Sequence, residues 1–199
     1  MTILKASKLH FEFSSQWIVC EYDNDPNGFY RQTVQKCQEI GAVDFIATNG
    51  NLMLWIEVTN FRSYHTEFRS RLLAQEPAEV VECRQQCSDK HDVKIIRSKA
   101  WIINEVVKKV CGTFFGLALA RREDDATLKP HIEALDRKLP IIIVLFLHLD
   151  AQLEAVQNFE SMAWRFKTQL EQQLRFLRVS VQVENSFTLP ENAGWKLKE

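Results

Sequence analysis

The chain is short of the two residue types that most often interrupt regular structure, with 6 glycines and 5 prolines among 199 residues. Long flexible linkers and turn-rich all-β folds need more of both, so this composition argues against them. A hydrophobic content of 46% excludes an intrinsically disordered chain. We therefore expect one ordered domain over residues 1–199 with a buried core.

An excess of charge of either sign is also missing. Lys and Arg total 25 against 26 Asp and Glu, so the formal net charge is −1. This balance excludes a globally basic, histone-like nucleic-acid binder but is compatible with a local basic groove. Any contact with nucleic acid must then come from a local cluster of basic residues.

The sequence has no secretory pattern and no long apolar run. Residues 1–12 lack the basic-then-apolar layout of a signal peptide. The most hydrophobic stretch, 139–149, is far shorter than the ~20 residues that a membrane helix needs. The 5 cysteines form an odd set, which is typical of reduced thiols. We therefore expect a cytoplasmic protein with no membrane partner.

Hydrophobic periodicity predicts strands that alternate with helices. The expected strands are two short ones within 9–22, a hairpin of 43–48 and 52–58 around Asn49-Gly50, a buried strand at 140–147 and a last strand at 179–183. Helices are expected over about 29–40, 98–120 and 151–177. The remaining segments are a turn at 23–28, a polar helical insertion at about 64–94, a polar connection at 124–138 and a loose tail at about 188–199.

This order of elements places the chain in the α/β class. Buried strands that are joined through helices imply a mixed β-sheet flanked by helices. The core of the domain is expected over about 9–62 and 98–185, with the polar insertion on its edge.

Two acidic residues at the ends of the hairpin strands are the most informative feature. Asp44 lies near the start of the first strand and Glu57 near the end of the second, so the Asn-Gly turn places them opposite one another. Their neighbours are apolar, and two carboxylates in such surroundings need a cation to offset repulsion and desolvation. The pair predicts a site for Mg²⁺ or Mn²⁺. The simpler interpretation is a hairpin with polar strand ends, in which Asp44 pairs with a nearby base.

The stretch from Val43-Asp44-Phe45 to Ile56-Glu57-Val58 resembles the signature of the PD-(D/E)xK, or restriction-endonuclease-like, nuclease superfamily. That signature is an Asp, a hairpin-sized gap and then Glu-x-Lys at a strand end, with a helix before it and a helix and then a strand after it. Uncharacterised bacterial members with a VDF…IEVKDFRG motif are similar over about residues 9–120, including HFEF, WIVCEYD, FYRQ and Lys109-Val110-Cys111-Gly112-Thr113. The resemblance implies a restriction-endonuclease-like core in which Asp44, Glu57 and the Val58 carbonyl bind Mg²⁺ or Mn²⁺ and DNA or RNA is hydrolysed.

The sequence departs from that signature at its lysine, where Thr59 stands. In the superfamily, this lysine is implied to orient the attacking water and to offset developing charge. A threonine hydroxyl can hold a water but supplies no positive charge. Some members recruit a basic residue from elsewhere, so Lys109, Lys108 or Arg62 is expected to supply it.

An alternative hypothesis is that the protein is a catalytically inactive nuclease-fold protein. It would bind nucleic acid, a protein partner or a second copy of itself, for example as a subunit of a bacterial defence or mobile-element system. The replacement of the signature lysine by Thr59 and the near-neutral net charge favour this hypothesis.

Two further patterns have simpler explanations than a second active site. Cys83, Cys87 and His91 would share one helix face, but a structural zinc site needs a fourth ligand and none is evident. Nothing beside Cys111 would activate its thiol. Trp55 is expected in the core of the sheet rather than on the surface as a platform for base stacking.

Overall fold

A computed structural model describes residues 1–36, 40–61, 101–149 and 159–198. Within these ranges the chain forms two β-sheets and a set of helices, which confirms the α/β class. The insertion predicted at 64–94 lies outside the described residues, and so do Arg62, Cys83, Cys87 and His91.

The larger sheet is mixed and has five strands. Their order is β3 (Ile18–Glu21), β4 (Phe45–Thr48), β5 (Met53–Asn60), β6 (Ile141–His148) and β7 (Ser180–Glu184). Strands β3, β4 and β5 are antiparallel neighbours, whereas β5, β6 and β7 run parallel. The pair β4 and β5 is the predicted Asn-Gly hairpin. Strand β6 is the predicted apolar strand, and its side chains enter the core on both faces of the sheet.

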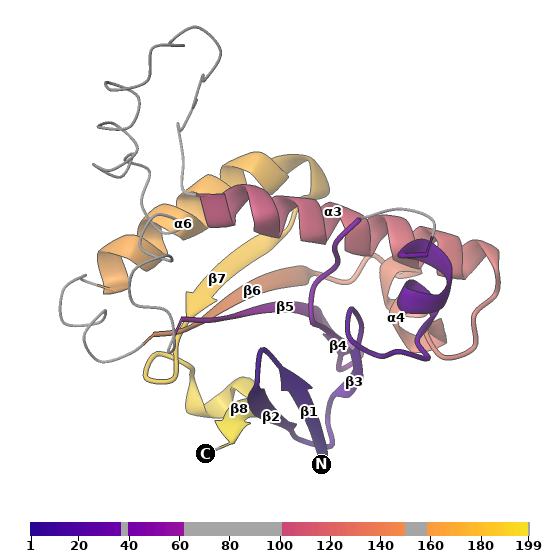
Figure 1. The fold of residues 1–199 in the computed structure, drawn as a ribbon, viewed down its shortest axis with the longest axis horizontal. Coiled ribbons are helices and arrows are strands. Elements are labelled where there is room, and N and C mark those ends of the chain that lie inside the picture. Colours follow the sequence, from indigo (N-terminus) through magenta and orange to yellow (C-terminus); the bar gives the residue numbers. More distant parts are fainter. Residues whose placement is uncertain (37–39, 62–100, 150–158, 199) are drawn as a thin grey trace, which may run out of the picture.

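Helices cover one face of this sheet (Figure 1). Helix α3 (Trp101–Arg122) precedes β6, and α6 (Phe159–Leu174) with the 3-10 turn Arg175–Leu177 precedes β7. Both lie where the crossovers between parallel strands are expected. The apolar stripe of α3 packs on Trp55 and Leu145 of the sheet.

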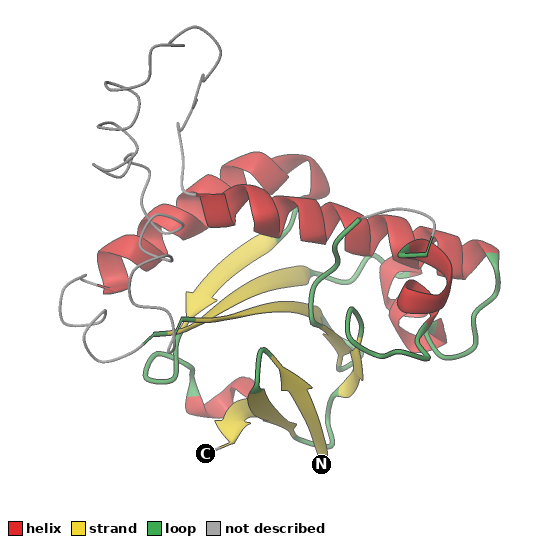
Figure 2. Cartoon of the chain, viewed as in Figure 1, coloured by secondary structure: helices red, strands yellow, loops and turns green. Residues whose placement is uncertain are grey.

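The opposite face of the sheet packs against a second sheet, not against helices, in the described part of the chain. Strands β1 (Thr2–Ala6), β2 (Leu9–Phe13) and β8 (Trp195–Lys198) form it in the antiparallel order β1-β2-β8. An aromatic cluster joins the two sheets and consists of Phe11, Phe13, Phe45, Phe146 and Trp195. The result is three layers, with the larger sheet in the middle (Figure 2).

Three predictions about single elements are wrong. The segment predicted as a loose tail contains β8, which pairs with β2 from the far end of the chain. The helix predicted over 29–40 is a five-residue π-helix, Tyr30–Val34, within the described residues. The predicted polar connection contains helix α4 (Lys129–Asp136), whose first turn follows an Asp125 carboxylate that accepts the N–H groups of Thr127 and Leu128. Strands and helices this short carry little local signal, and strand β1 was not predicted at all.

Trp195 tests whether the C-terminal strand belongs to the core. Trp195→Ala is expected to lower the free energy of unfolding by about 3–5 kcal/mol, because the indole is 5% exposed within the aromatic cluster. The control Phe187→Ala removes a ring that is 80% exposed and should change stability by less than about 0.5 kcal/mol. Urea denaturation followed by circular dichroism measures both, and equal effects would contradict a structural role for β8.

Candidate functional site

The two predicted acidic residues lie on the face of the hairpin that α3 covers. Phe45 pairs with Ile56, so Asp44 and Glu57 are the next residues along the two strands. Asp44 is 5% exposed and Glu57 is 4% exposed. The Asp44 Oδ2 atom accepts the Val58 N–H at 2.8 Å, which ties this carboxyl group to β5. The hairpin therefore holds both carboxyl groups in the interior.

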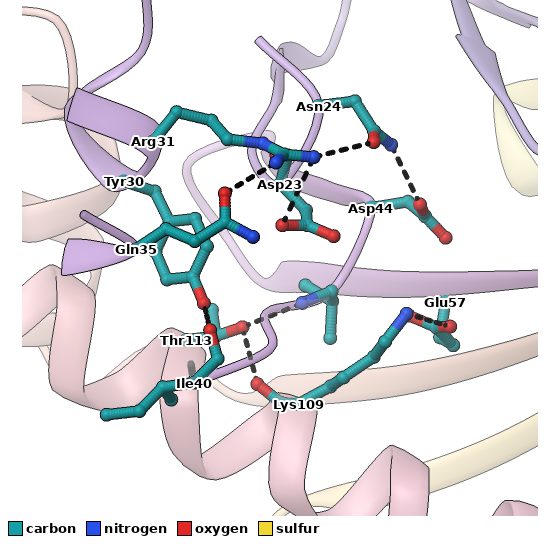
Figure 3. A network of polar contacts seen from close by, with 11 residues as sticks. Asp23, Asn24, Tyr30, Arg31, Gln35, Ile40, Asp44, Glu57, Lys109 and Thr113 are labelled. Atoms are coloured by element: carbon teal, nitrogen blue, oxygen red, sulfur yellow. Dashed lines mark hydrogen bonds and ion pairs between the residues drawn. The ribbon is translucent and has the colours of Figure 1, made fainter. Parts of the chain in front are cut away.

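Lys109 of α3 reaches Glu57 (Figure 3). Its Nζ lies 2.6 Å from Glu57 Oε1, and the two side chains are 21% and 5% exposed. The other oxygen of Glu57, Oε2, is buried and has no hydrogen-bond partner among the described residues. Lys108 lies on the exposed side of the helix. Of the two lysines expected to replace the signature lysine, Lys109 is thus the one that contacts Glu57.

One turn of α3 packs directly on the chain that leads into Asp44. The Thr113 Oγ1 atom accepts the N–H of Val43 at 3.1 Å. Gly112 lies against the backbone carbonyl of Gly41, and a β-carbon at Gly112 would collide with that carbonyl. The glycine therefore permits the close approach that brings the preceding turn of the helix to the carboxyl groups.

Burial and neighbouring charges shift the pKa of each ionisable group here. Burial raises the pKa of Glu57 well above its ordinary value and Asp44 adds to this, whereas Lys109 opposes it. Burial also raises the pKa of Asp44, against the effects of Lys109, the Val58 N–H and the Asn24 amide. Burial by itself would lower the pKa of Lys109, but Glu57 and Asp44 outweigh it and raise that pKa to about 12. Lys109 therefore carries its charge at neutral pH.

Two residues that follow β3 belong to this region and were predicted only as part of a turn. Asn24 Nδ2 donates to Asp44 Oδ1 at 3.1 Å. Asp23 has a buried Oδ1 that accepts no hydrogen bond, and Arg31 Nη2 lies 4.0 Å away. The sequence offered one signal for them, which is their place directly after a β-strand pattern. That strand, β3, pairs with β4, and Asp44 is the residue directly before β4.

Val58 and Thr59 complete the set predicted from the motif. The Val58 carbonyl, predicted as a metal ligand, accepts the Ser7 hydroxyl at 3.0 Å. Thr59 is half-buried on β5 beside Leu147 and shares the face of Glu57, because side chains alternate along a strand. A carbonyl oxygen has two lone pairs, so the Ser7 contact leaves one on Val58 for another partner.

Trp55 and Cys111 have no evident part in chemistry. Trp55 is fully buried with its ring 4.5 Å from that of Phe114, which confirms the prediction that it lies in the core. Cys111 is half-buried, and burial raises the pKa of its thiol, which disfavours the reactive thiolate.

The donor atoms around Asp44 and Glu57 suit a hard divalent cation. No three His, Cys, Asp or Glu side chains converge closely enough to hold a metal ion in the described ranges. Mg²⁺ is usually bound through one or two carboxylates and keeps several of its waters. Two carboxyl groups with the unpartnered Glu57 Oε2 therefore fit Mg²⁺ or Mn²⁺ better than an ion that needs a full set of protein ligands.

No family model matches the chain, and no curated protein or solved structure matches it either. None of the helices in the described part of the chain combines the length and the apolar character needed to cross a membrane. The basis for a functional hypothesis is therefore the arrangement of the side chains themselves.

The ion pair can be tested through stability. Lys109→Met leaves Glu57 buried without its cation and should cost about 3 kcal/mol, the lower end of the usual range because a fifth of the Lys109 side chain is exposed. The pKa of Glu57 is raised in the folded state, so an unpaired Glu57 destabilises the fold less as the pH falls and the carboxyl group takes up a proton. The loss should thus be smaller near pH 5 than near pH 8.

The double variant Glu57→Gln, Lys109→Met serves as the control. It removes both charges, so it should recover much of the lost stability and show little of this pH dependence. Urea denaturation at both pH values measures the free energy of unfolding of Lys109→Met, of the double variant and of Lys108→Met. Equal losses for Lys109→Met and Lys108→Met would show that the pair contributes nothing.

Proposed function

We propose that this protein is a phosphodiesterase that uses Mg²⁺ or Mn²⁺ to cleave DNA or RNA and has a restriction-endonuclease-like core. The contact between Lys109 and Glu57 carries the proposal, because it supplies a positive charge beside Glu57 in a sequence that has Thr59 in place of the signature lysine. The order of hairpin, helix α3 and parallel strand β6 also agrees with the order that the resemblance implies.

Each side chain has a separate task in this proposal. Asp44, Glu57 and the Val58 carbonyl would hold the ion, which when bound offsets phosphate charge and lowers the pKa of a water. Lys109 holds a fixed positive charge beside them and stabilises the negative charge that develops on the phosphoryl oxygens. Thr59 orients a water through its hydroxyl group.

The inactive nuclease-fold protein is the second candidate. One observation favours it: Lys109 pairs directly with Glu57 Oε1 at 2.6 Å, and a buried ion pair of this kind can act in stability alone. Such a protein would work by binding nucleic acid or a protein partner. Its function would then survive Glu57→Gln, whereas the first candidate would lose its activity.

A cleavage assay distinguishes the two candidates. Purified protein with Mn²⁺ or Mg²⁺ should cleave labelled single- or double-stranded DNA or RNA, and a chelator should abolish cleavage. Asp44→Asn, Glu57→Gln and Lys109→Met should each lower the rate by about 10²–10³-fold or more. Lys108→Met, the same change one residue away, should have little effect because Lys108 faces solvent.

Two results would contradict the proposed activity. The first is no cleavage by the wild-type protein under conditions in which a known nuclease is active. The second is cleavage that persists in Glu57→Gln, which would point to a contaminating enzyme. Unchanged binding to a partner or to nucleic acid in Glu57→Gln, together with either result, would favour the second candidate.

A further inference from the structure

Asp23 is a carboxyl group that the proposed reaction does not use. It lies two residues after the end of β3, and the N–H of the preceding Tyr22 donates to the Asp44 backbone carbonyl at 2.8 Å. The backbone of Asp23 thus runs beside that of Asp44. Its side chain is 17% exposed and lies in the polar network of Figure 3.

The neighbouring arginine does not satisfy this carboxyl group. Arg31 Nη2 lies 4.0 Å from Asp23 Oδ1, which is too long for a hydrogen bond. The guanidinium instead donates to the backbone carbonyl of Asp23, to Gln35 Oε1 at 2.5 Å and to Asn24 Oδ1 at 3.4 Å. Asp23 Oδ1 is therefore a buried acceptor without a donor.

Among the described residues, the carboxyl groups of this region outnumber its cations. Asp23, Asp44 and Glu57 share it with Lys109 and Arg31. Burial raises the pKa of Asp23, whereas Lys109 and then Arg31 lower it. Burial is also the main cause of the raised pKa of Asp44, and Asp23 adds to it. Asp44 is the acid that interacts with both Asp23 and Glu57, so a divalent cation beside Asp44 would offset the negative charge gathered there.

We propose that Asp23 is a third acid of this site and that it holds the cation through an intervening water, not by direct ligation. This inference rests on the proposed function. Direct ligation by all three acids does not fit the geometry, since no three such side chains converge closely enough among the described residues. Mg²⁺ and Mn²⁺ keep waters that need acceptors, and Asp23 Oδ1 is a buried acceptor with no donor.

Metal binding in the absence of nucleic acid tests the inference. Isothermal titration of the full chain with Mn²⁺ should give an affinity about 10–100-fold weaker for Asp23→Asn than for the wild type. Asp23→Glu keeps the charge and should bind Mn²⁺ more tightly than Asp23→Asn. Circular dichroism confirms that each variant is folded.

Asp25→Asn is the matched control, because it removes the same charge two residues away. The Asp25 Oδ1 atom accepts the N–H of Asn27 at 2.9 Å, and an asparagine oxygen can accept it as well. This variant should bind Mn²⁺ within about twofold of the wild type, since the Asp25 carboxyl group is engaged in its own turn.

Arg31→Gln separates a role in metal binding from a role in pairing. Removal of a positive charge should leave Mn²⁺ affinity unchanged or raise it. A loss as large as that of Asp23→Asn would show that Asp23 acts only through Arg31 and would overturn the inference. Wild-type affinity in Asp23→Asn would overturn the inference alone, whereas a wild-type protein that binds no Mn²⁺ would overturn the proposed function with it.

Discussion

The close packing of α3 against the chain that enters β4 is the contact on which the candidate site depends. Gly112 places no side chain between the helix and the Gly41 carbonyl, and Thr113 binds the N–H of Val43. At this separation Lys109, one turn earlier, reaches Glu57 in the sheet below. A larger residue at position 112 would displace the helix and with it the ammonium group, so backbone packing and site electrostatics are set by the same few residues.

The layers on the two faces of the larger sheet both support the end of β5. Helix α3 covers the face that bears Glu57, and the small sheet covers the other. In the turn between β1 and β2, the Ser7 hydroxyl donates to the Val58 carbonyl and the Ser7 carbonyl accepts the Asn60 amide. The strand end is thus held from both sides. This support holds the carboxyl groups of Asp44 and Glu57 in place against their mutual repulsion.

The burial of these carboxyl groups costs free energy, and a small number of direct contacts offset that cost. Each buried carboxyl group loses hydration, and among the described residues only Lys109 pairs closely with one of them. Asn24 and the Val58 N–H stabilise Asp44 through hydrogen bonds instead of full charges. The ion pair and these hydrogen bonds stabilise the region at which we propose that a divalent cation binds.

Local patterns in the sequence were sufficient for the α/β class, the β4–β5 hairpin, the buried strand β6, and the helices α3 and α6 within the described residues, because each depends on residues close together in the chain. The facing of Asp44 and Glu57 follows from the same hairpin. Only the folded structure distinguished Lys109 from Lys108, because that choice depends on how α3 is rotated on the sheet. Strand β8 and the positions of Asp23 and Asn24 likewise depend on contacts between segments that are distant in the chain. Such contacts produce no hydrophobic periodicity within either segment, so the sequence of one segment does not predict them.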